Sequence, residues 1–131
     1  MLFEAACRVR ASAYAPYSRF PVGAALLTAG GRIFAGCNVE NLSFGLTICA
    51  ERAAVAAAVA AGEREIAAVV VVADSREPVT PCGACRQVLA EFATSGLVVQ
   101  SANLAGAVYR AELEELLPRS SAGILDRDCS T

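Results

Sequence analysis

The stretch IAAVVVVAD, residues 66–74, decides the fold of this chain. It is a continuous apolar run rich in β-branched residues, which is typical of a strand buried on both faces. A helical pattern precedes it over residues 49–62, another follows over residues 82–94, and a second strand pattern, LVVQSA, occupies residues 97–102. Because a strand, a helix and a second strand in succession favour parallel pairing, the sequence predicts a parallel strand–helix–strand unit.

The amino-terminal part predicts one helix and one hairpin. Residues 2–15 carry alanine and apolar residues at helical spacing, and the two prolines of the following APYSRFP segment break the helix. The segments VGAALLT, residues 22–28, and RIFAGCNVE, residues 32–40, are typical of two strands joined by a turn at Gly30 and Gly31. We therefore expect an antiparallel hairpin before the first long helix.

The carboxyl-terminal part adds one strand and one short helix. GAVYRAE, residues 106–112, is expected to form the strand, and LEELL, residues 113–117, the helix, which Pro118 ends. From about residue 119 the chain is expected to form a loosely held tail. The order of elements predicts an α/β fold in a single domain, residues 1–131, with helices on both faces of a mixed sheet.

Composition limits the classes of function. The chain has 131 residues, of which 56% are hydrophobic, and its formal net charge is −2. Without a basic run, binding to nucleic acid is not expected. A domain of this size with so high a hydrophobic fraction is expected to bury part of its surface against other subunits. An alanine-rich composition is an alternative explanation of the high hydrophobic fraction.

Nothing in the sequence predicts secretion or a membrane span. MLFEAACRVR, residues 1–10, has an acidic side chain and no sustained apolar core, unlike a signal peptide. The longest apolar stretch, AAVAAAVAAG at residues 53–62, is far shorter than the ~20 residues that cross a bilayer. We therefore expect a cytoplasmic protein, in which a Cys-x-x-Cys pair is more often metal-binding or redox-active than part of a disulfide framework.

Three of the six cysteines are spaced for a metal site. The chain has no histidine, so its chemistry must use sulfur and carboxylate. In PCGACRQ, Cys82 and Cys85 share one face at the start of a helix, and in ICAER, Cys49 lies at another helix start. Helix amino termini favour thiolates. Three thiolates predict a zinc site with a fourth position open to water, as in catalytic zinc sites.

The charged residues after Cys49 have candidate roles. Glu51 is placed to take a proton from water and to pass it to a leaving group. Arg52 is placed to donate to the ligand sulfurs and to offset the formal charge of −1 that three thiolates and Zn²⁺ carry together. The alternative is that both residues are solvated charges in the first turn of a helix.

The remaining cysteines are not expected to bind metal, because Cys7, Cys37 and Cys129 lie outside this spacing. Two other classes of protein compete with a catalytic zinc site. A thioredoxin-like oxidoreductase would use Cys82 and Cys85 but leaves Cys49 and its neighbours unexplained. A structural zinc module would need a fourth protein ligand.

These motifs resemble those of a known family. A C-A-E segment followed by P-C-x-x-C resembles the zinc-dependent nucleoside and nucleobase deaminases. YAPYSRFPVGAAL, GCNVEN, CAER, PCGACRQ and ELLP also occur in the order and spacing of the small, homotetrameric, three-cysteine cytidine deaminases. The resemblance runs from about residue 14 to residue 118 and implies a three-layer α/β/α sandwich with a mixed five-stranded sheet.

The resemblance also implies an activity and its residues. The activity is zinc-dependent hydrolysis of cytidine and 2′-deoxycytidine to uridine and 2′-deoxyuridine with release of ammonia, as in pyrimidine salvage. The resemblance implies one zinc ion per subunit, Glu51 as the proton shuttle and a homotetramer. Ribose and base contacts would come from Phe20, Asn38, Val39, Glu40 and Ala50.

Two further observations bear on the substrate. A deaminase of a modified cytosine nucleoside, such as blasticidin S, shares the CAE and PCGxCRQ motifs, but the NVEN segment favours plain cytidine. Editing of cytosine in polynucleotides is disfavoured by the acidic balance. After ELLP, the relatives carry a phenylalanine that reaches a neighbouring active site, whereas this chain has Ser121 or a neighbour at that position.

Overall fold

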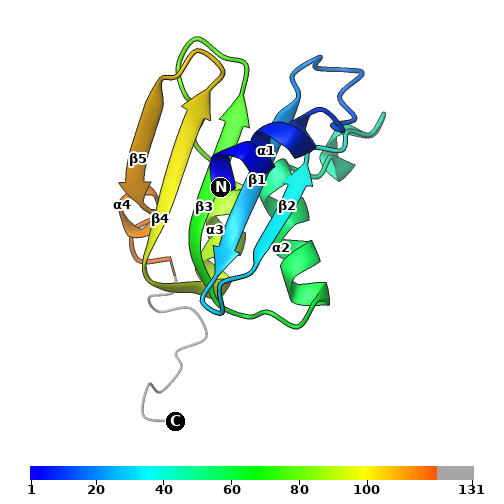
Figure 1. Cartoon of the computed structure of the whole chain (residues 1–131). Helices are drawn as coiled ribbons and strands as arrows, with labels where there is room; N and C mark the ends of the chain where they lie inside the picture. Colours follow the sequence, from blue (N-terminus) through cyan, green and yellow to red (C-terminus); the bar gives the residue numbers. More distant parts are fainter. Residues whose placement is uncertain (121–131) are drawn as a thin grey trace.

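The computed structural model describes residues 1–120 (Figure 1). Its helices and strands follow the order expected from the sequence. In chain order they are α1 (Leu2–Arg10), β1 (Val22–Thr28), β2 (Ile33–Cys37), the 3₁₀ turn η1 (Phe44–Leu46), α2 (Ala50–Ala60), β3 (Ile66–Ala73), α3 (Gly83–Phe92), β4 (Ala93–Asn103), β5 (Val108–Glu112) and α4 (Leu113–Leu116).

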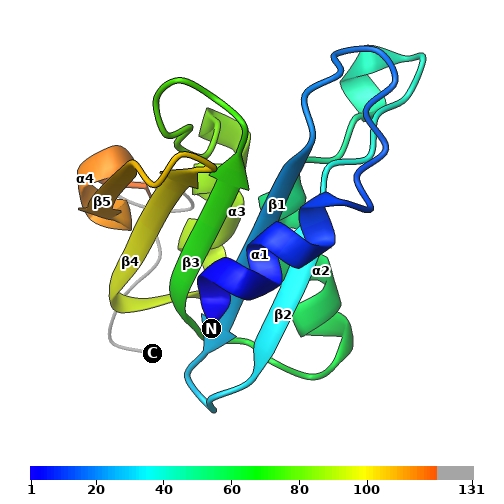
Figure 2. The same cartoon turned by 45° about the horizontal axis from the view of Figure 1, so that its top comes forward.

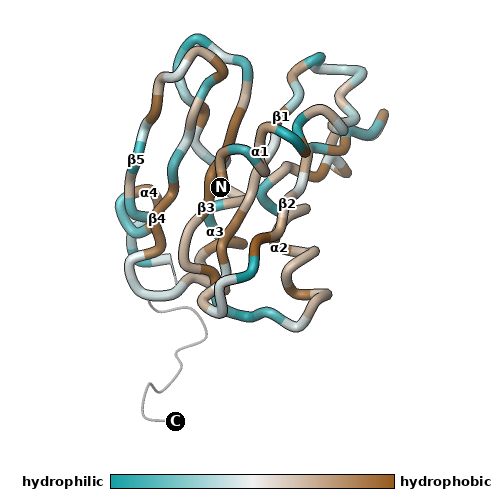
Figure 3. Tube along the Cα trace, viewed as in Figure 1, coloured by the Kyte–Doolittle hydropathy of each residue, from teal (hydrophilic) through white to brown (hydrophobic). Residues whose placement is uncertain are grey.

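One five-stranded sheet forms the middle layer, with strand order β2-β1-β3-β4-β5. β3 and β4 are parallel, and every other neighbouring pair is antiparallel, so the sheet is mixed as predicted. β3 lies at the centre of the sheet, and its apolar side chains belong to two hydrophobic cores, one on each face. Burial on both faces explains its uninterrupted apolar run (Figure 3). Because Val22 of β1 pairs with Ala73 of β3, β1 begins at the end of the sheet where β3 finishes.

Helices cover both faces of the sheet, which confirms the three-layer arrangement. α1 lies across β1, β2 and β3 on one face, and α2 and α3 lie on the other (Figure 2). The layers approach closely because small residues line them. A Cβ added to Gly23 of β1 would lie 2.0 Å from the carbonyl oxygen of Ala6 in α1, so only glycine fits there.

The first helix is shorter than predicted. The sequence pattern suggested residues 2–15, but α1 ends at Arg10. Tyr14 instead pairs with the segment after β2, with its N–H donating to Asn38 O (3.0 Å) and its carbonyl accepting from Glu40 N (2.8 Å). Pro16 also disfavours helical geometry in the residue before it. A long-range backbone pairing therefore overrides the local helical pattern at Tyr14.

Most other boundaries agree with the sequence within two residues, but β2 ends at Cys37 rather than residue 40, and the start of β4 also differs. α3 ends at Phe92 rather than Thr94, and β4 begins at Ala93, before the predicted 97–102 strand. The pairing between β3 and β4 shifts register within this added segment, next to Gly96 with its positive φ of 78°. The turn at Gly30 and Gly31 is confirmed.

Gly62 lies two residues after the end of α2 at Ala60, at the end of the helical pattern predicted over residues 49–62. Its φ of 97° lies in the left-handed region, and its N–H donates to Val59 O at 3.0 Å. The next N–H, from Glu63, donates to Ala58 O at 3.0 Å, which completes a Schellman motif.

Three predictions lie outside the described residues: the loosely held tail beyond residue 120, the missing aromatic at Ser121 and the non-ligand role of Cys129. Among the helices within residues 1–120, none has the length and apolar character to cross a bilayer.

Candidate metal centre and adjoining cavity

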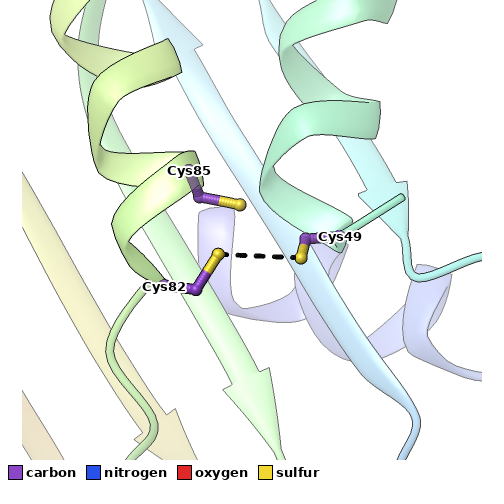
Figure 4. Close-up of side chains that lie close together, drawn as sticks. All are labelled: Cys49, Cys82 and Cys85. Carbon is purple, nitrogen blue, oxygen red and sulfur yellow. Dashed lines mark hydrogen bonds between the residues drawn. The ribbon is translucent and has the colours of Figure 1, made fainter. Parts of the chain in front are cut away.

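Three cysteines from two helix starts converge, as the sequence predicted. Cys49 is the N-cap residue of α2, Cys82 is the N-cap residue of α3, and Cys85 lies in the first turn of α3. Their sulfur atoms all lie within 4.8 Å of one another (Figure 4). Cys85 is buried, whereas Cys82 is exposed, so the cluster can be approached from one side.

The close approach of α2 to the sheet depends on Gly36 in β2. A Cβ at this position would lie 2.4 Å from Ala54 N and 2.7 Å from Ala50 O, both in the backbone of α2. Glycine lets the first turns of the helix pack directly on the strand. This contact fixes the height of Cys49 above the sheet.

The geometry of the cluster fits a zinc ion. Two thiolates at the usual Zn–S distance of about 2.3 Å in a tetrahedral site stand about 3.8 Å apart. The Sγ atoms of Cys49 and Cys82 are 3.8 Å apart. Within residues 1–120 the cluster holds three ligand side chains, so the fourth position of a tetrahedral zinc would be free for water.

The cluster favours negative charge on Cys49. Hydrogen bonds with Cys85, and then with Arg52 and Cys82, together lower the pKa of the Cys49 thiol to about 5 against the effect of burial. The hydrogen bond with Cys49, together with burial, raises the pKa of Cys85. A bound divalent cation would favour deprotonation of every ligand thiol.

Arg52 contacts the cluster as predicted. Its Nη2 lies 3.3 Å from Cys49 Sγ and 3.4 Å from the carbonyl oxygen of Thr47. Hydrogen bonds to Cys49 and then to Cys85 raise the pKa of the guanidinium. Its buried Nε has no hydrogen-bond partner in the described part of the chain. Arg52 is therefore a fixed positive charge beside the sulfurs and not a solvated surface side chain.

Glu51 is buried in the first turn of α2, with 5% of its surface exposed. Burial, with a smaller contribution from the nearby Cys49 thiolate, raises the pKa of its carboxyl to about 7. A carboxyl whose pKa lies near neutrality can both accept and return a proton. Ala50, also buried, precedes it as the first residue of the helix.

The predicted substrate-binding residues lie beside the start of α2. Val39 forms bridges with Tyr14 on one side and Ile48 on the other. Its pair with Ile48 has two hydrogen bonds of 2.9 Å, and Ile48 immediately precedes Cys49. Because Asn38 flanks Val39, this pairing brings the NVE segment to the edge of the cysteine cluster.

Asn38 fastens the segment before β1. Its Oδ1 accepts from Val22 N at 2.9 Å, and its Nδ2 donates to Phe20 O at 2.9 Å. The buried amide keeps one N–H and one lone pair that these bonds do not use. Phe20 is half-buried and held by its backbone.

Glu40 lines a cavity of about 250 Å³. The cavity is also lined by Tyr17, Ser18, Phe44 and Thr47. The rings of Tyr17 and Phe44 meet edge to face, with centroids 5.8 Å apart. The cavity thus combines a carboxylate with aromatic surface, which suits a sugar and a flat ring.

Sequence reasoning missed the structural role of Arg86. Its Nε donates to Pro81 O at 2.7 Å, its Nη1 to Leu116 O at 2.9 Å, and its Nη2 to Thr80 Oγ1 at 3.0 Å. These bonds join α4 to the segment just before Cys82. Its place in PCGACRQ was the only available signal, since no local pattern indicates contact with α4.

Comparisons with known proteins agree with this geometry. A family model described as the cytidine and deoxycytidylate deaminase zinc-binding region matches residues 1–101. A cytidine deaminase of Halalkalibacterium halodurans is 50% identical over 118 residues, which cover 90% of this chain and 89% of the relative. A blasticidin-S deaminase of Bacillus cereus is 31% identical over 105 residues, with 74% of each chain covered.

The fold is also shared with a solved structure. The crystal structure of a cytidine deaminase from Burkholderia pseudomallei matches with a TM-score of 0.86 at 51% identity. The match covers 89% of this chain and 94% of that one.

Proposed function

This chain belongs to the cytidine and deoxycytidylate deaminases, and we propose that it hydrolyses cytidine and 2′-deoxycytidine to uridine and 2′-deoxyuridine with release of ammonia. The observation that carries the proposal is the buried carboxyl of Glu51 next to three converging thiols. This combination supplies a proton carrier and a metal-ligand set within the first turns of two helices.

The residues divide the work at the reacting end of the substrate. Cys49, Cys82 and Cys85 would hold a zinc ion, which when bound acts as a Lewis acid that activates water for attack on C4. Glu51 would take one proton from that water and deliver it to N3, and would then move the second proton from the new C4 hydroxyl to the departing amine. Arg52 holds positive charge against the thiolates, which keeps the ligand set from becoming too electron-rich.

Glu40 in the adjoining cavity, together with residues that lie outside its lining, would bind the nucleoside. Asn38 and Glu40 offer a donor and an acceptor to sugar hydroxyls, and Phe20 and Val39 offer apolar surface to the base and sugar. The backbone at Ala50 would contact the base at the start of α2. Free cytosine lacks the sugar, so it should leave these polar groups without partners and react poorly.

A modified cytosine nucleoside such as blasticidin S is the second candidate substrate. The 31% identity to a blasticidin-S deaminase favours it, but the cytidine deaminase relative is more similar, at 50%. The presence of both Asn38 and Glu40 also supports an unmodified sugar.

We further propose a homotetramer that acts in the cytoplasm. Large apolar side chains stand exposed near the cavity, among them Leu42, Phe44 and Leu46, and burial against another subunit would remove them from water. Cys7, Cys37 and the three cluster cysteines are all free thiols, which suits a reducing compartment.

The test incubates purified protein with cytidine, 2′-deoxycytidine, cytosine or blasticidin S and follows the loss of the substrate's ultraviolet absorbance. Rapid turnover of the first two, with cytosine poor, is expected. Preference for blasticidin S would select the second candidate, and similar kcat/KM for cytosine and cytidine would overturn the sugar-binding role of Asn38 and Glu40.

A further inference from the structure

The carboxylate of Glu40 is held by the loop before β1. Its Oε1 accepts two backbone N–H groups, from Tyr17 at 2.9 Å and from Ser18 at 3.1 Å. Its Oε2 accepts the hydroxyl of Ser18. Both carboxylate oxygens are therefore fixed by two consecutive residues.

The hydroxyl of Ser18 also reaches the residue expected to face the base. Its oxygen accepts the backbone N–H of Phe20 at 3.0 Å while its hydrogen is donated to Glu40. One exposed side chain thus joins Glu40 to the backbone of Phe20. No contact of Ser18 with the cysteine cluster accompanies these bonds in the described residues, so its effect on chemistry must pass through Glu40 or Phe20.

The loop holds this arrangement against a local preference. Arg19, between Ser18 and Phe20, has a φ of 56°, in the left-handed region that non-glycine residues seldom adopt. Its N–H donates to Ala15 O at 2.9 Å and closes the turn. A conformation of this kind persists where surrounding contacts determine it, and the bonds to Glu40 are such contacts.

The number of bonds limits what Glu40 can accept from a ligand. A carboxylate oxygen has two lone-pair sites. Oε1 uses both for Tyr17 and Ser18, whereas Oε2 uses one for Ser18 and keeps one. Glu40 in this arrangement can accept one further hydroxyl, and the Ser18 bond decides where Oε2 points.

We propose that Ser18 is a positioning residue that aims Oε2 of Glu40 at a single sugar hydroxyl of the substrate. Selectivity for nucleosides that carry this hydroxyl would then depend on Ser18, which lies outside the metal centre. The inference rests on the proposed function, because it takes a cytosine nucleoside as the ligand. It predicts that removing the serine hydroxyl weakens binding only for ligands that have the matching sugar hydroxyl.

The test combines a protein change with a ligand change. Ser18→Ala, Ser18→Thr and the wild-type enzyme are compared for KM and kcat with cytidine, and for competitive inhibition by 2′,3′-dideoxycytidine, which lacks both secondary hydroxyls. Ser12→Ala is the matched control, since Ser12 is an exposed serine on the same inter-element segment. Thermal unfolding of each variant confirms that the fold is kept.

For Ser18→Ala, KM for cytidine should rise roughly three- to tenfold, because a carboxylate that is aimed less well weakens its one sugar hydrogen bond without abolishing it. The sugar contact is the same in the ground and transition states, so kcat should stay within about twofold. The inhibition constant of the dideoxynucleoside should not change. Ser18→Thr keeps the hydroxyl and should restore KM, and Ser12→Ala should match wild type.

Assays with 2′-deoxycytidine and 3′-deoxycytidine then identify the hydroxyl that Glu40 reads, because only one of the two should lose its sensitivity to Ser18→Ala. An equal rise for cytidine and the dideoxynucleoside would overturn the proposal and place the effect on Phe20. An unchanged KM for cytidine would also overturn it. Absence of cytidine turnover by the wild-type enzyme would instead reject the proposed function, and the inference with it.

Discussion

The guanidinium of Arg52 lies against the sulfur of Cys49, with Nη2 3.3 Å from Sγ. The two residues are three positions apart at the start of α2, and Glu51 lies between them in the chain with its carboxyl buried. Three thiolates around a divalent ion carry a formal charge of −1, and a fixed cation at this distance offsets it. In the proposed mechanism, the same short segment would therefore supply a metal ligand, a proton carrier and a counter-charge.

Replacing Arg52 should separate metal binding from turnover. In Arg52→Gln the thiolates keep their geometry but lose the cation that draws electron density from them. A hydrogen bond to a charged group is worth ~1.5–3 kcal/mol, so kcat should fall roughly ten- to hundredfold. Metal analysis should still find one zinc ion per chain.

The control for this change is Arg64→Gln. Arg64 binds the carbonyl oxygens of Val59 and Glu63 at the far end of α2, at 2.9 and 2.8 Å. The Arg64→Gln substitution should leave kcat unchanged. A value of kcat for Arg52→Gln within twofold of wild type would show that the cluster does not need the counter-charge.

Glu51→Gln should keep the fold and the metal but lose nearly all turnover. Glutamine has the same size and fits the buried position, but it cannot carry the proton. Proton transfer by a positioned side chain contributes ~10²–10⁴-fold, and here one residue serves both water and leaving group. The loss should lie at the upper end of that range.

Steady-state kinetics and zinc content would be measured beside Glu91→Gln, which changes an exposed carboxylate on α3. If Glu51→Gln retained a tenth of the wild-type kcat, another group would have to carry the proton.

The titration of Glu40 should report its bond to Ser18 without any assay of activity. The hydroxyl of Ser18, followed by the backbone N–H groups of Ser18 and Tyr17, holds the pKa of this carboxyl below its usual value. A lowered pKa means that these bonds stabilise the folded protein above the usual pKa and are lost as pH falls through the lowered one.

Carbon NMR of the side-chain carboxyl would give the pKa directly. In Ser18→Ala it should move up towards the usual value of about 4.3, while Ser18→Thr should keep the low value. An identical pKa in wild type and Ser18→Ala would mean that the hydroxyl does not hold the carboxylate.

Local patterns in the sequence were sufficient for the sheet centre and the metal centre. The β-branched run at residues 66–74 predicts a central strand because burial on both faces requires it. Cys82 and Cys85 converge because helical spacing places them on one face, and the third thiol could be assigned because the chain has no histidine.

Long-range contacts account for what the sequence did not predict. Tyr14 leaves its helical pattern because it pairs with a segment more than twenty residues away. Ser18 reads as a turn residue in APYSRFP, and its bond to Glu40 depends on how the loop folds back. Arg86 contacts α4, thirty residues further along the chain. No period or local motif carries this information.

The exposed loop between β2 and α2 should mediate assembly. Leu42 is 78% exposed and Leu46 is 65% exposed, although both are large and apolar. Leu42→Asp combined with Leu46→Asp should convert the proposed homotetramer to smaller species, as measured by light scattering. Leu104→Asp, in the turn between β4 and β5, is the control and should keep the assembly. A wild-type mass near 13.5 kDa at micromolar concentration would contradict the tetramer.

Gly36→Ala should displace Cys49 of the metal centre by pushing α2 away from β2. The added Cβ would meet Ala54 N at 2.4 Å and Ala50 O at 2.7 Å, which are backbone atoms that cannot rotate away. The first turns of α2 must therefore shift, and Cys49 must shift with them. Overpacking of this kind typically costs about 1–3 kcal/mol, so the melting temperature should fall by several degrees. The value of kcat should fall by more than the loss of folded protein explains, because a catalytic site tolerates little displacement.

Gly30→Ala is the matched control, with the same substitution in the same hairpin. A Cβ at Gly30 would lie 3.6 Å from its nearest neighbour, Glu63 Oε1, an ordinary contact with a flexible side chain. This variant should keep the wild-type melting temperature, zinc content and kcat. Calorimetry, metal analysis and cytidine turnover on both variants then separate a general effect of hairpin alanine from an effect on α2. If Gly36→Ala matched the control in all three measurements, α2 could move without disturbing Cys49, and the contact with β2 would not set the position of the site.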